Sequence, residues 1–181
     1  MQNFYKHYPE IDNVYWTNYF LNNFIPKNLD SILKSSYVMY YKKDFNKNLE
    51  ILKLSALLTN KLKFPPIEYF SIFRHIADQP IHADGINAVR NASFNLPLLG
   101  FERTQMCFYN TKSNAIPKRR DAFFFEKEDV DLVTKLKGCN NWVLVNSSIP
   151  HNIENVDVNN PRLTACIRFS GNPTFEDLIK N

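Results

Sequence analysis

The chain has 181 residues, with 22 basic and 18 acidic side chains that give a formal net charge of +4. It is 44% hydrophobic, and its 15 Phe and 9 Tyr exclude a chain that is disordered throughout. No apolar run approaches the roughly 18 residues of a membrane span, and so small a charge is no evidence for nucleic-acid binding. We expect a single domain, residues 1–181, because a chain of this length buries roughly 70% of its unfolded surface.

The three cysteines, Cys107, Cys139 and Cys166, lie far apart and form no CxxC pair. This pattern argues against a disulfide framework and against a zinc knuckle. Because no signal segment opens the sequence, we expect reduced thiols and a cytoplasmic protein. The glycine-rich loops of nucleotide-binding folds are absent, which removes the main sequence support for such a fold.

Residues 1–66 are predicted to form a helical cover. A short helix is expected over Asn28–Lys34, after Pro26. A longer amphipathic helix is expected over Asn46–Lys63, where apolar residues follow a three-four spacing until a proline pair ends the helix. The face expected to be buried contains Leu49, Leu52, Ala56 and Leu57.

Between residues 67 and 175 the hydrophobic period changes to two, as in β-strands. Short β-rich runs alternate with Pro, Gly and Asn turns, which favours an antiparallel sandwich or barrel over βαβ units. The exception is Glu128–Leu136, where we expect one or two helical turns within a connection. The expected strands are Glu68–Ile76, Ala92–Leu99, Thr104–Tyr109, Ala122–Phe125, Asn141–Asn146, Ile149–Val156 and Leu163–Phe169.

Two of these strands have one polar and one apolar face, because successive side chains of a strand point to opposite sides. Along Arg162–Phe169 the even-numbered residues are polar, apart from Cys166, and the odd-numbered ones are apolar. In Ala92–Leu99, Ser93 and Asn95 point away from the apolar residues. We expect the long helix to cover the apolar faces. A polar interior is costly unless its groups are hydrogen-bonded, so it should hold a ligand or a metal ion.

The tripeptide His82–Asp84 places an imidazole and a carboxylate on one side of an extended backbone, where both can reach one cation. Taken alone, the tripeptide is better explained as a surface histidine before an Asp-Gly turn. His151, and then Arg162 with Thr164, extend it to the pattern H-x-D…H…R-x-T. Two imidazoles and one carboxylate bind Fe(II) in non-haem oxygenases, and an arginine beside a hydroxyl suits a dicarboxylate.

Five segments match a known family pattern: IHADG (Ile81–Gly85), RNASFNLPLLG (Arg90–Gly100), MCFY (Met106–Tyr109), IPHNIEN (Ile149–Asn155) and PRLTACIRF (Pro161–Phe169). Through them the chain resembles the Fe(II)/2-oxoglutarate-dependent dioxygenase superfamily over roughly Glu68–Phe175. Within it, the chain is most similar to aspartyl/asparaginyl β-hydroxylase-like and phage-encoded members. The resemblance implies a double-stranded β-helix over residues 67–175, which is a cupin-like jelly roll forming an antiparallel barrel. It also implies Fe(II), 2-oxoglutarate as co-substrate, and O₂.

By this resemblance, His82, Asp84 and His151 correspond to the metal ligands and form the catalytic centre. The expected reaction couples oxidation of a substrate to decarboxylation of 2-oxoglutarate, and a hydroxylase is the expected type. Asp84 argues against a halogenase, in which a chloride ion takes the place of the carboxylate ligand.

The resemblance also assigns four residues to the co-substrate. Arg162 corresponds to the arginine that pairs with the far carboxylate of 2-oxoglutarate, and Thr164 to the hydroxyl often found beside it. Ser71 corresponds to a second hydroxyl that joins this arginine in the β-hydroxylases. Arg90 is similar to an arginine at the other end of the co-substrate, although its spacing to Pro97 differs by one residue.

The identity of the substrate stays open. We expect a small molecule or a protein side chain, since the chain has no basic stripe of the kind that a nucleic-acid demethylase of the same superfamily uses. A cupin-like module that binds a metal or ligand without turnover is the alternative outside the enzymes. No membrane partner is expected.

Four further residues allow two interpretations each. Arg168 either grips the same diacid as Arg162 or forms a salt bridge or a contact with a lid, and we favour the latter pair of roles. His75 is interpreted as a hydrogen-bonded core or rim histidine rather than a functional one. Asn95 and Tyr109 either line the pocket or satisfy polar groups of the core.

Overall fold

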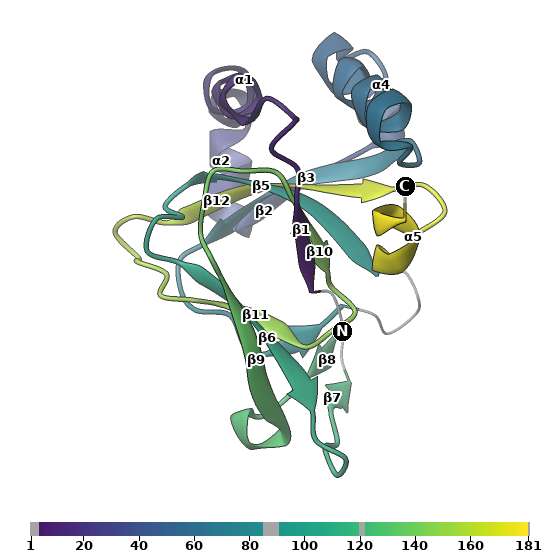
Figure 1. Cartoon of the computed structure of the whole chain (residues 1–181). Helices are drawn as coiled ribbons and strands as arrows, with labels where there is room; N and C mark the ends of the chain where they lie inside the picture. Colours follow the sequence, from purple (N-terminus) through teal and green to yellow (C-terminus); the bar gives the residue numbers. More distant parts are fainter. Residues whose placement is uncertain (1–3, 85–90, 120–121, 181) are drawn as a thin grey trace.

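A computed structural model describes residues 4–84, 91–119 and 122–180, and it contains two six-stranded sheets that lie one above the other (Figure 1). Every described strand pairing is antiparallel. The major sheet has the order β1 (Tyr5–His7), β10 (Val143–Asn146), β5 (Ala92–Leu99), β12 (Arg162–Phe169), β3 (Ile67–His75) and β2 (Tyr37–Tyr41). The minor sheet has the order β7 (Lys118–Arg119), β8 (Phe123–Phe124), β4 (His82–Ala83), β11 (His151–Glu154), β6 (Gln105–Thr111) and β9 (Val130–Lys137).

The architecture is mainly β and jelly-roll-like, but it differs from the expected barrel. In the part of the chain that the structure describes, no strand of one sheet pairs with a strand of the other, so the sheets are not closed into one ring. Side-chain packing holds them together instead. Met106, Phe108 and Ile153 of the minor sheet pack against Val143 and Val145 of the major sheet, which fills part of the space between the sheets with apolar side chains.

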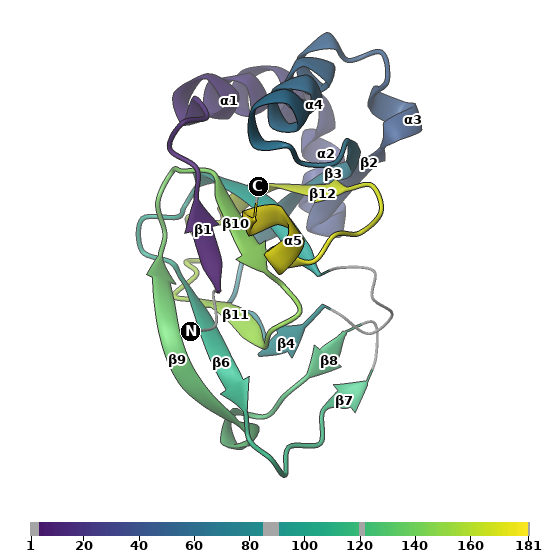
Figure 2. The same ribbon diagram turned by 45° about the vertical axis from the view of Figure 1, so that its right-hand side comes forward.

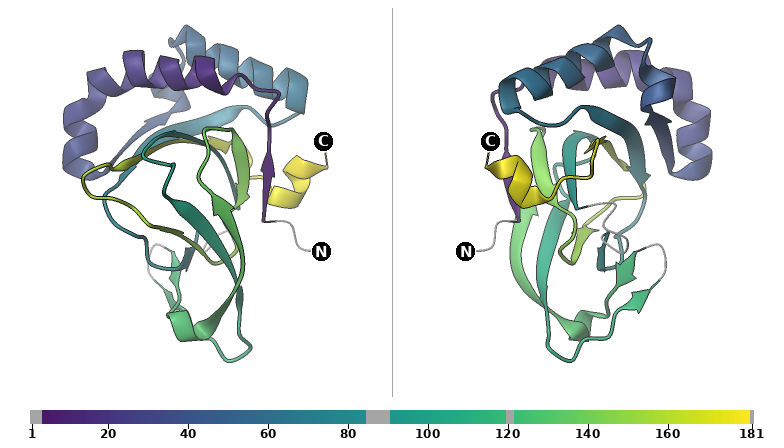
Figure 3. Two further views of the ribbon diagram at one scale, coloured as in Figure 1. Left: turned by 60° about the vertical axis from the view of Figure 1, so that its left-hand side comes forward. Right: turned by 90° about the vertical axis from the view of Figure 1, so that its right-hand side faces the viewer.

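The helices lie across the outer face of the major sheet, as Figures 2 and 3 show. They form a third layer, and their buried residues join those of the sheet in one large core. Phe20, Phe70 and Phe94 are fully buried there, together with Trp142, whose ring stacks on Phe94 at 4.8 Å. The helical elements are α1 (Asn13–Tyr19), the π-helix η1 (Phe20–Phe24), α2 (Ile25–Ser35), α3 (Lys42–Phe45), α4 (Leu49–Leu62), the 3₁₀ helix η2 (Lys127–Asp129) and α5 (Phe175–Ile179). Of these, η2 and the C-terminal α5 are not part of the cover.

The long predicted helix is confirmed as α4, but the predicted face was wrong. Leu49 and Leu52 are 63% and 40% exposed. The side chains that pack on the sheet are instead Ile51, Leu54, Leu58 and Leu62. Both sets follow a helical spacing, because α4 carries apolar residues on more than one side. Contact with the sheet selects one of them, and the local sequence does not specify which.

The predicted helical turns over Glu128–Leu136 were also wrong. Apart from the single 3₁₀ turn η2, this stretch is the edge strand β9, which pairs with β6 along its whole length. Only Val130 of β9 is buried. The strand is therefore held by backbone hydrogen bonds to β6 rather than by an apolar face, and it leaves a weak pattern in the sequence.

The predicted alternation along β12 is confirmed. Arg162, Thr164, Cys166 and Arg168 line a cavity between the sheets, whereas Ala165, Ile167 and Phe169 belong to the core beneath the helices. The same division holds along β5, where Ser93 and Asn95 line the cavity. The residues before 67 also contribute β1 and β2 to the major sheet, so this part is more than a cover. Among the described helices, none is both long and apolar enough to cross a membrane.

Candidate metal and anion site

A cavity of about 300 Å³ lies between the sheets, beside this apolar cluster. His82 and His151 approach it from the minor sheet, and Arg162 and Arg168 from the major sheet. Its volume falls at the lower end of the range for small-molecule sites, which is about 300–1,000 Å³. The cavity is thus large enough for a small ligand, and both charged and neutral polar groups face it.

The two histidines are direct neighbours across strands. His151 of β11 pairs in register with His82 of β4, although 69 positions separate them in the sequence. Side chains at such paired positions lie on the same face with Cβ atoms about 4.5–5.5 Å apart. The imidazole centroids are 4.6 Å apart. Strand pairing, rather than proximity along the chain, brings the two rings together.

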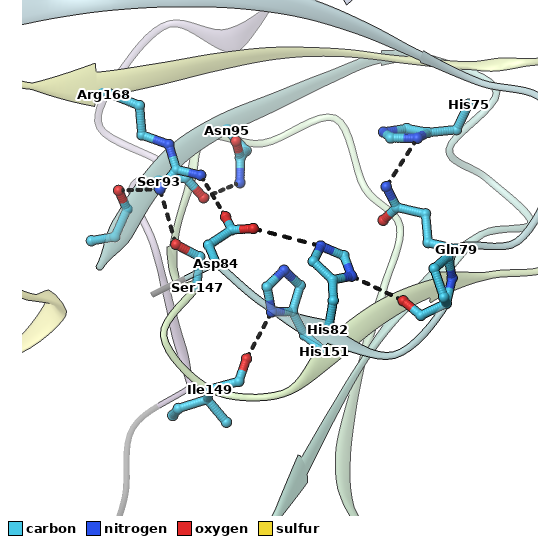
Figure 4. Close-up of polar contacts among 12 residues, drawn as sticks. His75, Gln79, His82, Asp84, Ser93, Asn95, Ser147, Ile149, His151 and Arg168 are labelled. Atoms are coloured by element: carbon cyan, nitrogen blue, oxygen red, sulfur yellow. Dashed lines mark hydrogen bonds and ion pairs between the residues drawn. The ribbon is translucent and has the colours of Figure 1, made fainter. Parts of the chain in front are cut away.

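Both imidazoles are oriented by backbone carbonyls (Figure 4). His82 Nδ1 lies 2.9 Å from the carbonyl oxygen of Pro80, and His151 Nδ1 lies 2.7 Å from that of Ile149. Because a carbonyl only accepts, each Nδ1 carries the hydrogen of the neutral ring. Each Nε2 therefore keeps its lone pair, and a second bond that fixes the ring in this way is typical of metal-binding histidines.

Asp84 supplies the third ligand atom of the group. Its Oδ1 lies 3.6 Å from His82 Nε2, and the ligand atoms of His82, Asp84 and His151 all lie within 4.8 Å of one another. The backbone N–H of Asp84 donates to Ser147 O at 2.8 Å, which holds the backbone of this residue in place. Two imidazole nitrogens and a carboxylate oxygen form a donor set that suits a divalent transition-metal ion.

The charges of this group also suit a metal ion. Burial, with a smaller contribution from His82, lowers the pKa of His151 to about 4, so its ring is neutral near pH 7. Burial alone raises the pKa of Asp84, but the Arg168 guanidinium and the two imidazoles outweigh it and hold the pKa below its usual value. A neutral imidazole and an ionised carboxylate are the forms that bind metals.

Arg162 is a second feature of the same cavity. Its side chain is only 5% exposed, and its Nε and Nη1 donate to the hydroxyls of Thr164 at 3.2 Å and Thr104 at 3.4 Å. Within the described residues, no carboxylate forms an ion pair with it. Burial lowers its pKa to about 10, which leaves the guanidinium charged near neutral pH. A buried cation without an acidic partner is costly, so this end of the cavity is suited to an anion.

The remaining predicted co-substrate residues are less well placed. Ser71 on β3 is fully buried against Cys166 and is not among the residues that line the cavity. Arg90 lies outside the described residues. Thr164 is close to Arg162, as stated above, and both line the cavity.

Arg168 and Asn95 both line the cavity, whereas Tyr109 does not. Of the two roles favoured above for Arg168, the structure shows the salt bridge, which it forms to Asp84. Asn95 donates from Nδ2 to Ser93 Oγ at 2.9 Å. The hydroxyl of Tyr109 donates within a group on the opposite face of the minor sheet, which contains Asn152 and Glu154. All three cysteines are free, as expected.

Thr104 is a residue that the sequence analysis missed. It precedes β6, and its hydroxyl donates to Phe101 O at 3.0 Å and lies at the Arg162 guanidinium. No motif distinguishes this threonine from others in the sequence. Only the turn at residues 101–104, closed by a hydrogen bond from Thr104 N to Phe101 O, places it there.

No protein-family model matches the chain, and no curated protein is significantly similar to it. Among solved structures, the chain matches the non-haem α-ketoglutarate-dependent carbocyclase SnoK from nogalamycin biosynthesis, with 14% identity and a TM-score of 0.53, over 90% of this chain and 78% of that one. The E. coli protein ycfD matches with 8% identity and a TM-score of 0.36, over 98% of this chain and 57% of that one, which is too distant to bear on the fold. The match to SnoK shows a shared fold.

Proposed function

We propose that this protein is an Fe(II)- and 2-oxoglutarate-dependent oxygenase, and that it hydroxylates a small molecule or a protein side chain. One observation carries the proposal: a His82, Asp84 and His151 group and the buried, acid-free guanidinium of Arg162 face the same cavity. The fold shared with SnoK, itself described as a non-haem α-ketoglutarate-dependent enzyme, supports it.

The metal-binding part of the proposal rests on the hydrogen bonds that orient the three ligands. The Nδ1 bonds of both histidines direct Nε2 toward Asp84, and Arg168 occupies Oδ2 of Asp84 so that Oδ1 is left for the ion. Two histidines and one carboxylate on one face of an ion leave positions open, which is the arrangement of non-haem Fe(II) oxygenases. Bound Fe(II) supplies the activation of O₂, chemistry that protein side chains lack.

The co-substrate part rests on Arg162. A guanidinium can bind a carboxylate with two parallel charge-assisted hydrogen bonds, and the hydroxyls of Thr164 and Thr104 already fix its orientation. Arg162 and the metal ligands belong to different sheets and face one cavity, so a short molecule with a carboxylate at one end and metal-binding oxygens at the other suits the space between them. 2-Oxoglutarate has this shape and charge.

Among members of the superfamily, we place the chain nearest the β-hydroxylase-like and phage-encoded ones. The support is the set of five matching sequence segments, which contain β4, β5, β6, β11 and β12 or most of their residues. Ser71 and Arg90 stay in this proposal as predicted co-substrate residues. In proteins that share a fold, the loops around the binding site determine the substrate, and these loops are also the most variable part of the sequence. The shared fold therefore does not identify the substrate of this protein.

The test is to titrate 2-oxoglutarate into protein with and without Mn(II) in a calorimeter, and to follow succinate formation with Fe(II), ascorbate and O₂. We expect 2-oxoglutarate binding that requires the metal ion, and succinate formation that is lost in His82→Ala and His151→Ala. Lys118→Ala, which removes only an exposed ion pair with Glu126, is the control and should match the wild type. Equal binding of 2-oxoglutarate with and without metal contradicts the proposal, as does unchanged turnover in either histidine variant. Metal-dependent binding without turnover favours the cupin-like binding module.

A further inference from the structure

His75 is a further polar residue that lines the cavity, and the proposed function gives it no role. It is the last residue of β3 and pairs in register with Arg162 on the neighbouring strand β12. Paired residues project from the same face of a sheet with Cβ atoms about 4.5–5.5 Å apart. Both side chains line the cavity, so any anion bound by Arg162 lies within reach of this imidazole.

The imidazole of His75 is held on two sides. Its ring stacks on Phe73, with centroids 6.0 Å apart and an interplanar angle of 12°. Its Nδ1 lies 3.2 Å from Gln79 Nε2. Gln79 is itself fixed, because its backbone N–H donates to Ile153 O at 2.9 Å and its backbone carbonyl accepts from Asn152 Nδ2 at 3.3 Å. The ring is therefore positioned before any ligand binds.

The partner of Nδ1 also determines the tautomer. An amide NH₂ group only donates, so Nδ1 of His75 accepts from Gln79 and the ring hydrogen resides on Nε2. Figure 4 shows Gln79 against one nitrogen of the ring, with the other nitrogen directed away from it. His75 thus presents an N–H donor to the cavity.

The same imidazole is uncharged near neutral pH. Burial, followed by the charges of Arg162 and His82, lowers the pKa of His75 to about 4. A neutral donor adds a hydrogen bond beside Arg162 without adding a second positive charge. The Arg162 end of the cavity then carries a single positive charge, which balances the single negative charge of one carboxylate group.

We propose that His75 is a further co-substrate-binding residue, whose Nε2–H donates to the carboxylate that Arg162 binds. The inference rests on the proposed function in naming 2-oxoglutarate as the source of that carboxylate. It differs from the interpretation of His75 as a hydrogen-bonded core histidine. That structural role requires no hydrogen on Nε2, and it predicts that replacing His75 leaves the affinity for 2-oxoglutarate unchanged.

Two variants of His75 separate these roles in a calorimetric titration of 2-oxoglutarate into Mn(II)-loaded protein. His75→Phe keeps a ring that can stack on Phe73 but lacks the donor, and we expect it to weaken 2-oxoglutarate binding about 10-fold or more. His75→Gln keeps an N–H at a similar reach, and we expect its affinity to stay within about threefold of the wild type. Mn(II) affinity should be unchanged in both variants, since neither alters His82, Asp84 or His151.

A measurement on the unmodified protein covers the case in which the Phe variant folds poorly. In Zn(II)-loaded wild type, ¹⁵N-edited spectra of the histidine rings should show His75 as the Nε2–H tautomer, and the signal of this hydrogen should shift when 2-oxoglutarate is added. Its absence from the spectrum of His75→Gln assigns the signal. A hydrogen on Nδ1, or a signal that 2-oxoglutarate leaves in place, overturns the inference.

The outcomes distinguish this inference from the proposed function. If wild type binds 2-oxoglutarate and His75→Phe binds it equally well, the role of His75 is wrong and the proposed function stands. An equal loss in the Phe and Gln variants also overturns the inference, since the donor then makes no difference. If wild type itself shows no metal-dependent binding of 2-oxoglutarate, the proposed function fails.

Discussion

Arg168 and Asp84 form a largely buried ion pair at the cavity, with Nη2 2.8 Å from Oδ2, although the residues are 84 positions apart in the sequence. Nη1 of the same guanidinium donates to Ala92 O at 2.7 Å and to Ser147 Oγ at 2.9 Å. Arg168 is thereby fixed from three directions and fixes Asp84 in turn. One oxygen of the carboxylate is occupied, and the other is left facing His82.

This relationship predicts that Arg168 acts on the metal ion through Asp84. Removing the guanidinium in Arg168→Ala frees the carboxylate to rotate, and loss of such an outer partner typically costs 10–100-fold in metal affinity. We expect a decrease of about this size in Mn(II) affinity, measured by calorimetry. Lys118→Ala, which removes an exposed ion pair with Glu126, is the control. Equal Mn(II) affinity in the two variants contradicts the role.

Arg162 should act on the co-substrate and not on the metal. Arg162→Ala removes a charged partner from a carboxylate, which costs about 1.5–3 kcal/mol, and we expect 2-oxoglutarate affinity to fall about 10–150-fold. Arg162→Lys should recover only part of it, because an ammonium lacks the planar fork that binds both oxygens. Calorimetric titrations of 2-oxoglutarate and of Mn(II) test both statements. Unaltered 2-oxoglutarate affinity in Arg162→Ala is the result that would count against them.

The strands and the polar face of the site were predictable because they depend on local alternation. β5 begins and ends where the sequence predicted, and the even-numbered residues of β12 face the cavity as expected. The pattern around His82 and His151 selected the residues that the structure brings together. What the sequence lacks is the register, since the pairing of β4 with β11 depends on backbone hydrogen bonds that carry no residue signature.

Features that depend on a distant partner were not predictable. β9 forms because the edge of β6 is available to it, and Arg168 of β12 meets Asp84 only because the two sheets face each other across the cavity. Thr104 reaches Arg162 only through the turn at residues 101–104. In each case the local sequence allows several conformations, and long-range contact selects one.

The corrected face of α4 gives a matched pair of stability tests. Leu54 is fully buried on the sheet, whereas Leu52 is 40% exposed on the same helix. Leu54→Ala leaves a cavity in the core, and we expect the free energy of unfolding to fall by about 2–5 kcal/mol. Leu52→Ala should cost less than about 1 kcal/mol. Urea unfolding of both variants measures these changes. An equal decrease in the free energy of unfolding would contradict the burial of Leu54 in preference to Leu52.

Acid should destabilise the protein through its buried histidines. The pKa of His75 is about 4 in the folded state, because of burial and the charges of Arg162 and His82, and its ordinary value is 6.5. Between these values the unfolded chain binds more protons than the folded one, so the free energy of unfolding falls as the pH drops from 6.5 to 4. The loss from His75 is up to about 3 kcal/mol, and His151, with a pKa also lowered to about 4, adds to it.

Urea unfolding in the presence of EDTA, at a series of pH values from 4 to 7.5, measures this loss without a contribution from bound metal. His75→Gln removes one of the two histidines with a lowered pKa, so its free energy of unfolding should fall less steeply across the interval, by about one bound proton. Near pH 7.5 both rings are almost fully neutral in either state, and the curves of variant and wild type should become parallel there. Curves that stay parallel down to pH 4 would mean that His75 titrates alike in the folded and unfolded chain, and that the cavity does not hold it neutral.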